Sequence, residues 1–244
     1  MGTSYVMSSA RLRDGDQSGG STMTTVKSAT TSESYRPAGW AAIASGAIGM
    51  IAIGSLIAYL ATQATEFLES GVMPPVGRLL LTSNYVGVML QALFMIPAAL
   101  ALHALGRQRS PGMSRAAVTV GIIALCGVAL LRLLLLINPA VSDILFMGPV
   151  GFVGLWLIVV NWLLAGVLSR ALRITGTLAG VGLVILGASF FFLGGLVVLT
   201  DGPFAYAKDV DFHIGIAIGG FPGFIVYPIW AILLGRQLLR ARDA

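Results

Sequence analysis

The chain has 244 residues, of which 57% are hydrophobic and 10% are charged, and its mean hydropathy is +0.90. Soluble globular domains carry roughly 25% charged residues, so this composition predicts an integral membrane protein and excludes an ordinary soluble domain. The formal net charge is +5. Its basic residues stand in short segments between apolar runs, where they indicate membrane orientation and argue against nucleic-acid binding.

The first 36 residues are rich in Gly, Ser and Thr and precede the first apolar run. Such a segment has too little apolar surface to bury, so we expect residues 1–36 to form a disordered cytoplasmic tail. No apolar stretch of signal-peptide length lies within it. Met7 and Met23 are alternative start positions to Met1, and the short polar lead-in after Met23 favours the hypothesis that the native chain begins there.

Residues 37–240 contain six apolar runs separated by charged or turn-forming residues. Each run reaches the ~20 residues that a helix needs to cross a bilayer, and the period-2 alternation of a transmembrane barrel is absent from the sequence. We therefore predict an all-α fold, a polytopic bundle of six transmembrane helices. The expected spans are 40–62, 80–105, 116–138, 148–168, 177–199 and 212–234.

The third run carries a permanent charge, Arg132, inside its apolar sequence. At 1.5 Å per residue Arg132 lies about 9 Å from the end of that run, within a hydrocarbon layer about 30 Å thick. An unpaired guanidinium there costs about 2.5 kcal/mol or more. Arg132 must therefore reach the interface, pair with an acidic side chain or bind a ligand, and the sequence favours the structural alternatives.

Lysine and arginine concentrate on one side of the predicted spans, and acidic residues on the other. The positive-inside rule then places both termini in the cytoplasm and Arg132 in the outer half of a cell (inner) membrane. The basic side holds Arg36, Arg107, Arg109, Arg115, Arg170, Arg173, Arg236, Arg240 and Arg242. The other side holds Glu66, Glu69, Asp143, Asp201, Asp209 and Asp211, with Arg78 and Lys208 as its basic residues.

Polar residues within the predicted spans are few. Four of them are candidates for one outward-facing ligand pocket: Asn84, Gln91, Arg132 and His213. A guanidinium in such a pocket would clamp a carboxylate, a phosphate or a lipid headgroup. The alternative interpretation is that Arg132 makes a structural ion pair with a carboxylate of an outer loop.

Asp209, Asp211 and His213 stand at alternate positions, which makes them weak candidates for a divalent-metal site. An ordinary polar loop is the favoured interpretation, so we expect neither a metal nor a cofactor. The sequence lacks the motifs of serine hydrolases, zinc proteases, phosphate-binding loops and dithiol enzymes. We therefore expect a protein that is not an enzyme.

Glycines recur at helical spacing in two of the predicted spans. Gly215, Gly219 and Gly223 repeat every four residues, and Gly176 and Gly180 form a second pair. Small residues at this spacing let neighbouring backbones approach closely, which is a main source of helix association in lipid. We predict that these five glycines lie on helix-packing faces.

Two further patterns concern the shape of the bundle. Pro97, Pro222 and Pro228 lie inside spans and predict local irregularities. Paired as hairpins, the spans end alike on the basic side, as in Gly106-Arg-Gln and Gly235-Arg-Gln. The pattern is compatible with three hairpin repeats around an axis along the membrane normal, or with a common way of ending a span on the basic side.

Part of the chain also resembles a known family. The segments that carry the resemblance are Gly-Phe-Val-Gly-Leu-Trp156, Leu-Leu-Ala-Gly166 with Arg170 and Arg173, and Tyr227-Pro-Ile-Trp230-Ala-Ile-Leu-Leu-Gly235-Arg. They are similar to small bacterial six-helix membrane proteins of a family without assigned function, over about the last 100 residues. The resemblance implies a compact helical bundle in a bacterial inner membrane. It implies no activity and no site residues.

Two functions from different classes remain. The glycine faces, the short loops and the scarcity of ionisable groups favour a non-enzymatic bundle that binds a lipid or a partner membrane subunit, including a second copy of this chain. The alternative is a small transporter or permease for an anionic or amphipathic solute, anchored by Arg132. The two hypotheses differ in whether Arg132 is structural or binds the solute.

Overall fold

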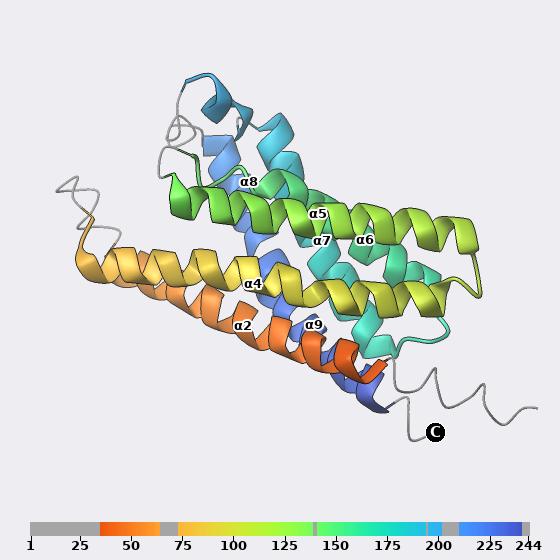
Figure 1. Cartoon of the computed structure of the whole chain (residues 1–244). Helices are drawn as coiled ribbons and strands as arrows, with labels where there is room; N and C mark the ends of the chain where they lie inside the picture. Colours follow the sequence, from red (N-terminus) through yellow and green to blue (C-terminus); the bar gives the residue numbers. More distant parts are fainter. Residues whose placement is uncertain (1–34, 64–72, 139–140, 194, 202–209, 241–244) are drawn as a thin grey trace, which may run out of the picture.

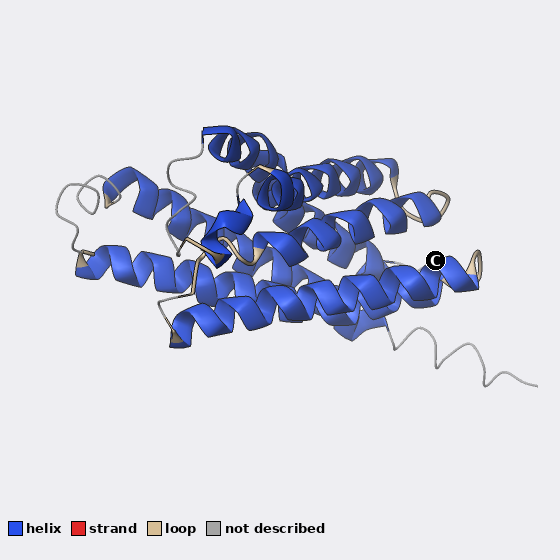
Figure 2. Cartoon of the chain, turned by 90° about the horizontal axis from the view of Figure 1, so that it is seen from above, coloured by secondary structure: helices blue, strands red, loops and turns tan. Residues whose placement is uncertain are grey.

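A computed structural model describes residues 35–63, 73–138, 141–193, 195–201 and 210–240. Within these ranges the regular structure is helical and contains no strand (Figure 2), which confirms the predicted all-α class. The helices are α2 (Tyr35–Thr62), α4 (Pro75–Gly106), α5 (Pro111–Ile137), α6 (Met147–Leu163), α7 (Arg170–Phe192), η1 (Gly195–Leu199), α8 (Val210–Gly220), η3 (Phe221–Ile225) and α9 (Val226–Arg240). The predicted tail lies outside the described residues apart from its last two, which begin α2.

Five helical segments are long and apolar enough to cross a membrane. They are α2, α4, α5, α7 and the continuous run Asp211–Arg240 formed by α8, η3 and α9. Helix α6 is equally apolar but has 17 residues, about 25 Å of helix. The structure is therefore a helical bundle with the element lengths of a membrane protein.

Several helices begin earlier than the apolar pattern indicates. Helices α4 and α5 start with Pro75 and Pro111, positions where the missing N–H of proline leaves no hydrogen bond unmade. Helix α7 starts at Arg170 because Ser169 caps it, its Oγ accepting from Leu172 N at 3.3 Å. Hydropathy locates the buried part of a helix and misses these polar first turns.

Helix α6 ends at Leu163, whereas the sequence predicts a helix to residue 168. Side chains from neighbouring segments donate hydrogen bonds to carbonyl oxygens that, in a longer helix, would accept from the helix's own backbone N–H groups. Arg109 Nη1 donates to Leu163 O at 3.4 Å, and Gln237 Nε2 donates to Val167 O at 2.9 Å. The chain therefore leaves the helix without stranding these carbonyl groups.

The fifth predicted span, 177–199, is divided in the structure. Helix α7 ends at Phe192, and the 3₁₀ helix η1 follows from Gly195. A Cβ atom on Gly195 would lie 2.5 Å from Phe190 Cα, so the chain folds back against the end of α7 too closely for any side chain. This turn requires glycine for steric reasons.

The last predicted span contains the irregularity expected at Pro222. Residues Phe221–Ile225 form a π-helical segment between α8 and α9. Proline lacks the N–H that an α-helix needs and its ring displaces the preceding turn, which explains the wider winding there. Pro97 and Pro228 lie within α4 and α9, which keep their α-helical winding.

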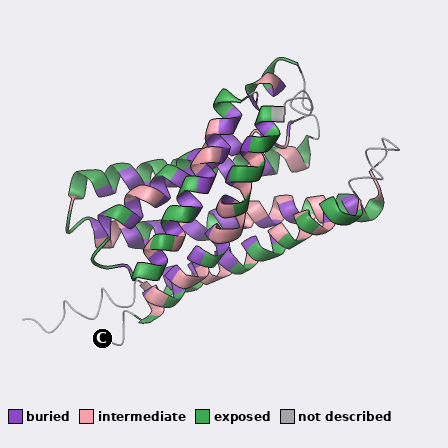
Figure 3. Ribbon diagram, turned by 180° about the vertical axis from the view of Figure 1, so that it is seen from behind, coloured by how far each residue is buried: buried purple, intermediate pink, exposed green. Residues whose placement is uncertain are grey.

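The helices close into a ring. Successive helices lie side by side from α2 through α4, α5 and α6 to α7, and α9 packs against both α7 and α2. Figure 1 shows α2, α4 and α5 across the front, with α7 and α9 behind them. Buried residues face the inside of the ring and exposed residues lie on its outside (Figure 3). Many of the exposed side chains are large and apolar, such as Ile123, Trp162 and Phe192 at 67%, 70% and 82% exposure. A bilayer would cover such a surface.

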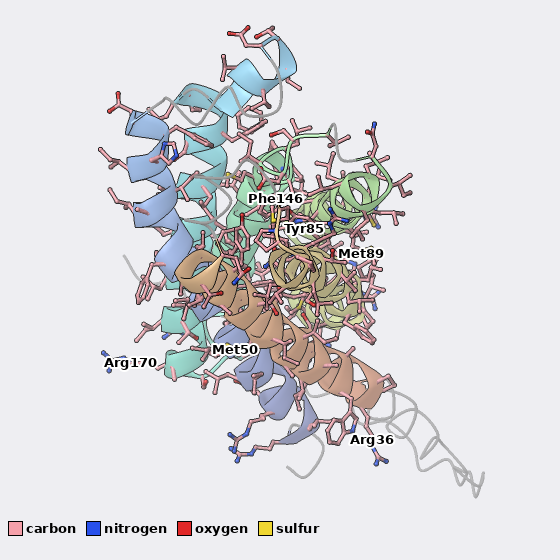
Figure 4. All side chains as sticks on the ribbon, turned by 90° about the vertical axis from the view of Figure 1, so that its left-hand side faces the viewer. Arg36, Met50, Tyr85, Met89, Phe146 and Arg170 are labelled. Carbon is pink, nitrogen blue, oxygen red and sulfur yellow. The ribbon has the colours of Figure 1, made fainter. Side chains whose placement is uncertain are left out.

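One end of the bundle gathers the arginines. There Gly39 of α2 packs on Gly235 of α9, with 3.1 Å between an added Cβ and the Gly235 oxygen. The Arg109 contact joins the turn after α4 to the end of α6, and the Gln237 contact joins α9 to the turn after α6. We call this end of the bundle the basic end, and Figure 4 labels Arg36 and Arg170 on it. Its described basic residues are Arg36, Arg107, Arg109, Arg115, Arg170, Arg173, Arg236 and Arg240.

Candidate functional site

Arg132 lies on the inner face of α5 and is 5% exposed. Its guanidinium carbon is 3.5 Å from the ring centroid of Phe146 and 5.0 Å from that of Tyr85. Phe146 in turn stacks on Phe224 of η3, with 6.0 Å between the centroids. We call Arg132, Tyr85, Phe146 and Phe224 the arginine–aromatic cluster. Figure 4 labels Tyr85 and Phe146 close to each other; Tyr85 lies in the first half of α4, and Phe146 directly precedes α6.

The cluster surrounds the positive charge of Arg132 with groups that stabilise it. Aromatic faces attract a cation, and the attraction is strongest where water is excluded. Asp143, on the connection between α5 and α6, interacts electrostatically with both Arg132 and Tyr85. Arg132 therefore packs among protein groups instead of facing acyl chains, although its Nε has no hydrogen-bond partner.

Asn84 and Gln91 lie on α4 and engage α2. The Asn84 amide donates from Nδ2 to Ala52 O at 2.9 Å, and the Gln91 main-chain oxygen accepts from Ser45 Oγ at 2.8 Å. The Gln91 side chain packs over Gly49 of α2. The Asn84 bond satisfies a polar side chain between apolar helices, whereas the Gln91 bond uses the main chain and leaves its side-chain Nε2 without a partner.

His213 lies apart from the other three candidates. It is exposed on α8, which packs mainly against α7, whereas Arg132 lies between α4, α5 and the start of α6. Asp211 is exposed on the same helix, and Asp209 lies outside the described residues. Among the residues that the structure describes, no group of three potential metal ligands comes together.

The glycines singled out by their spacing lie where segments approach most closely: Gly215, Gly219 and Gly223 face α7, and Gly176 and Gly180 on α7 face α6 and α9. A Cβ on Gly219 would be 2.8 Å from Gly182 O, and one on Gly180 would be 2.9 Å from Gly154 O. Both contacts are with backbone oxygens, which cannot swing away. Helix α7 is therefore held on two sides by direct backbone packing.

Sequence reasoning misses an apolar groove of about 610 Å³ on the outside of the bundle. It lies between α5, α6, the end of α7 and η1. Its lining residues are Val120, Ile123, Ala124, Gly127, Leu131, Leu145, Gly148, Pro149, Phe152, Phe190, Phe191, Leu196 and Leu199. None of them carries a polar side chain. The small residues Gly127 and Gly148 hint at a hollow, but the sequence does not say which helices face each other.

Comparison of the chain with protein-family models, curated proteins and solved structures found no match. The class of protein therefore rests on the fold itself, an all-α bundle with several helices long and apolar enough to span a membrane. The resemblance to small bacterial six-helix membrane proteins stays a prediction.

Proposed function

We propose that this protein crosses the membrane six times and binds a phospholipid acyl chain without catalysing a reaction. The helix ends support six crossings. The start of α2, the turns after α4 and α6, and the end of α9 meet at the basic end. The chain must therefore return to that end once for each pair of helices. Helix α6, at about 25 Å, needs only the turns that follow it to complete a crossing.

The charge distribution supports one orientation of the proposed bundle. Arginines crowd one end, while the described acidic residues Asp143, Asp201 and Asp211 belong to connections or helix starts at the other. The positive-inside rule then puts the basic end and both termini in the cytosol of a bacterial inner membrane. The arginine–aromatic cluster then belongs to the outer half of the bilayer, and the groove extends from the outer half to about the middle of α5.

The groove is the single observation that carries the proposed lipid binding. Its volume, about 610 Å³, falls within the roughly 300–1,000 Å³ of small-molecule sites. Along α5 it extends from Val120 to Leu131, about 16 Å of helix. Its lining is apolar and its rim includes the exposed side chains of Ile123 and Phe152. Among the molecules present in a membrane, the acyl chain of a phospholipid best matches a groove that is elongated, apolar and exposed to lipid.

Transport of an anionic solute is the less favoured function. An anchor for such a solute would have to offer its guanidinium to an open pocket. Arg132 is 5% exposed and lies against two aromatic rings. These contacts suit a structural cation better than a binding group that must capture and release an anion.

Filling the groove tests the proposal. Ile123→Trp places a bulky ring at the groove, and Ile57→Trp is a matched control because Ile57 is similarly exposed, at 54%, on α2 away from it. Native mass spectrometry with added phosphatidylglycerol should show one retained phospholipid on the wild type and the control. The retained fraction should fall at least fivefold in Ile123→Trp.

Two outcomes would contradict acyl-chain binding. One is equal lipid retention by all three proteins. The other is a lipid-free dimer that Ile123→Trp separates into monomers, because the groove would then be a contact between subunits.

A further inference from the structure

A second cavity lies inside the ring, separate from the lipid-facing groove. Its volume is about 40 Å³. Residues from six helical segments line it: Val88, Gln91 and Ala92 of α4, Leu125 and Val128 of α5, Val150 and Val153 of α6, Leu183 of α7, Phe224 of η3 and Tyr227 of α9. The cavity therefore occupies the centre of the bundle.

Two polar side chains at this cavity lack partners. Gln91 Nε2 and Tyr227 Oη are buried and have no hydrogen bond within the described structure. Their residues are 7% and 8% exposed, so neither group reaches bulk water. Buried polar atoms in a protein interior are nearly always bonded, and in a membrane no lipid tail can replace the missing partner.

We propose that this cavity is a binding site for water, held by Gln91 and Tyr227. One water molecule needs roughly 10–15 Å³, so the cavity has room for about three or four. The Gln91 amide donates through Nε2 and the Tyr227 hydroxyl can donate or accept, so the ligand must accept at Gln91, and water can do so while bonding Tyr227 in either sense. The described lining carries no ionised group, which favours a small neutral molecule over an ion.

The arginine–aromatic cluster closes the site toward the end opposite the basic end. Phe224 lines the cavity and stacks on Phe146, whose ring contacts Arg132. Val128 and Val88 of the lining lie one turn along α5 and α4 from Arg132 and Tyr85, on the cavity side of them. The water site therefore lies about one helical turn from this cluster, on its side toward the basic end.

Solution NMR of the full chain in lipid nanodiscs tests the proposal. The Gln91 side-chain amide protons should show cross-relaxation peaks with water. The Asn84 amide is the matched control, because it is buried at 4% exposure and bonded to Ala52 O. We expect no water peak there. Tyr227→Phe removes one of the two holding groups and should reduce the Gln91–water peak at least twofold.

Xenon provides a second measurement with opposite expectations. Empty apolar cavities bind xenon, whereas hydrated polar ones do not. For a water site, xenon pressure should leave the methyl resonances of Val88 and Val150 unchanged. Absence of a Gln91–water peak, or xenon-induced shifts at these two valines in the wild type, would overturn the proposal.

Discussion

Arg132→Gln is expected to lower the melting temperature by about 5–10 °C. A desolvated cation–π contact is worth about 2 kcal/mol or more, and 1 kcal/mol shifts the melting temperature of a chain this size by about 2–4 °C. The glutamine side chain cannot stack on Phe146 at 3.5 Å as a cation, and it removes the positive charge that interacts with Asp143. Thermal unfolding in detergent, followed by fluorescence, measures the effect.

Two other variants separate the causes. Arg132→Lys keeps the charge and loses the planar contact with the rings, so its melting temperature should lie between those of the wild type and Arg132→Gln. Arg78→Gln is the control. Arg78 is exposed in the same half of α4 as Tyr85, so the protein should tolerate the change within about 1 °C. An Arg132→Gln protein of unchanged stability that had lost anion uptake into proteoliposomes would instead identify a transporter.

Gly219→Leu should prevent folding or destabilise the bundle by more than 3 kcal/mol. Overpacking typically costs about 1–3 kcal/mol when neighbouring side chains can shift. Here the added Cβ would meet backbone atoms of α7, at 2.8 Å from Gly182 O and 2.9 Å from Leu186 N. Movement of either would require α7 and α8 to separate. The yield of monodisperse protein and its melting temperature measure this loss.

The neighbouring glycine supplies the control for this substitution. An added Cβ on Gly220 has no neighbour nearer than 3.8 Å, so Gly220→Leu should fold with near wild-type stability. Equal tolerance of both leucines would show that α8 does not pack on α7 as described. Equal damage by both would point instead to a general intolerance of leucine near the π-helical segment.

The class of fold is predictable from sequence because apolar runs, the charged residues between them and the spacing of glycines are local properties. The all-α class and an irregularity at Pro222 follow from such patterns alone. Helix boundaries are less predictable, because they depend on partners from distant segments. The end of α6 is set in part by Arg109 and Gln237, and no pattern around Leu163 reveals them.

The candidate site is predictable only as a set of residue types. The sequence identifies Arg132 as a charge that needs an environment, but the rings that surround it come from α4 and from the turn before α6. Likewise Asn84 and Gln91 are recognisable as polar residues in a span, whereas their contacts with α2 depend on the order of helices around the ring. That order is a tertiary property.

Cysteine accessibility on intact cells tests the six crossings and their orientation most directly. In a Cys126→Ala background, single cysteines would replace Gln108 and Ala165, which are exposed near the basic end, and Thr200, which is exposed on the turn after η1. A membrane-impermeant maleimide should label Thr200→Cys on intact cells, and should label Gln108→Cys and Ala165→Cys only after permeabilisation. Labelling of Gln108→Cys or Ala165→Cys from outside would contradict the account.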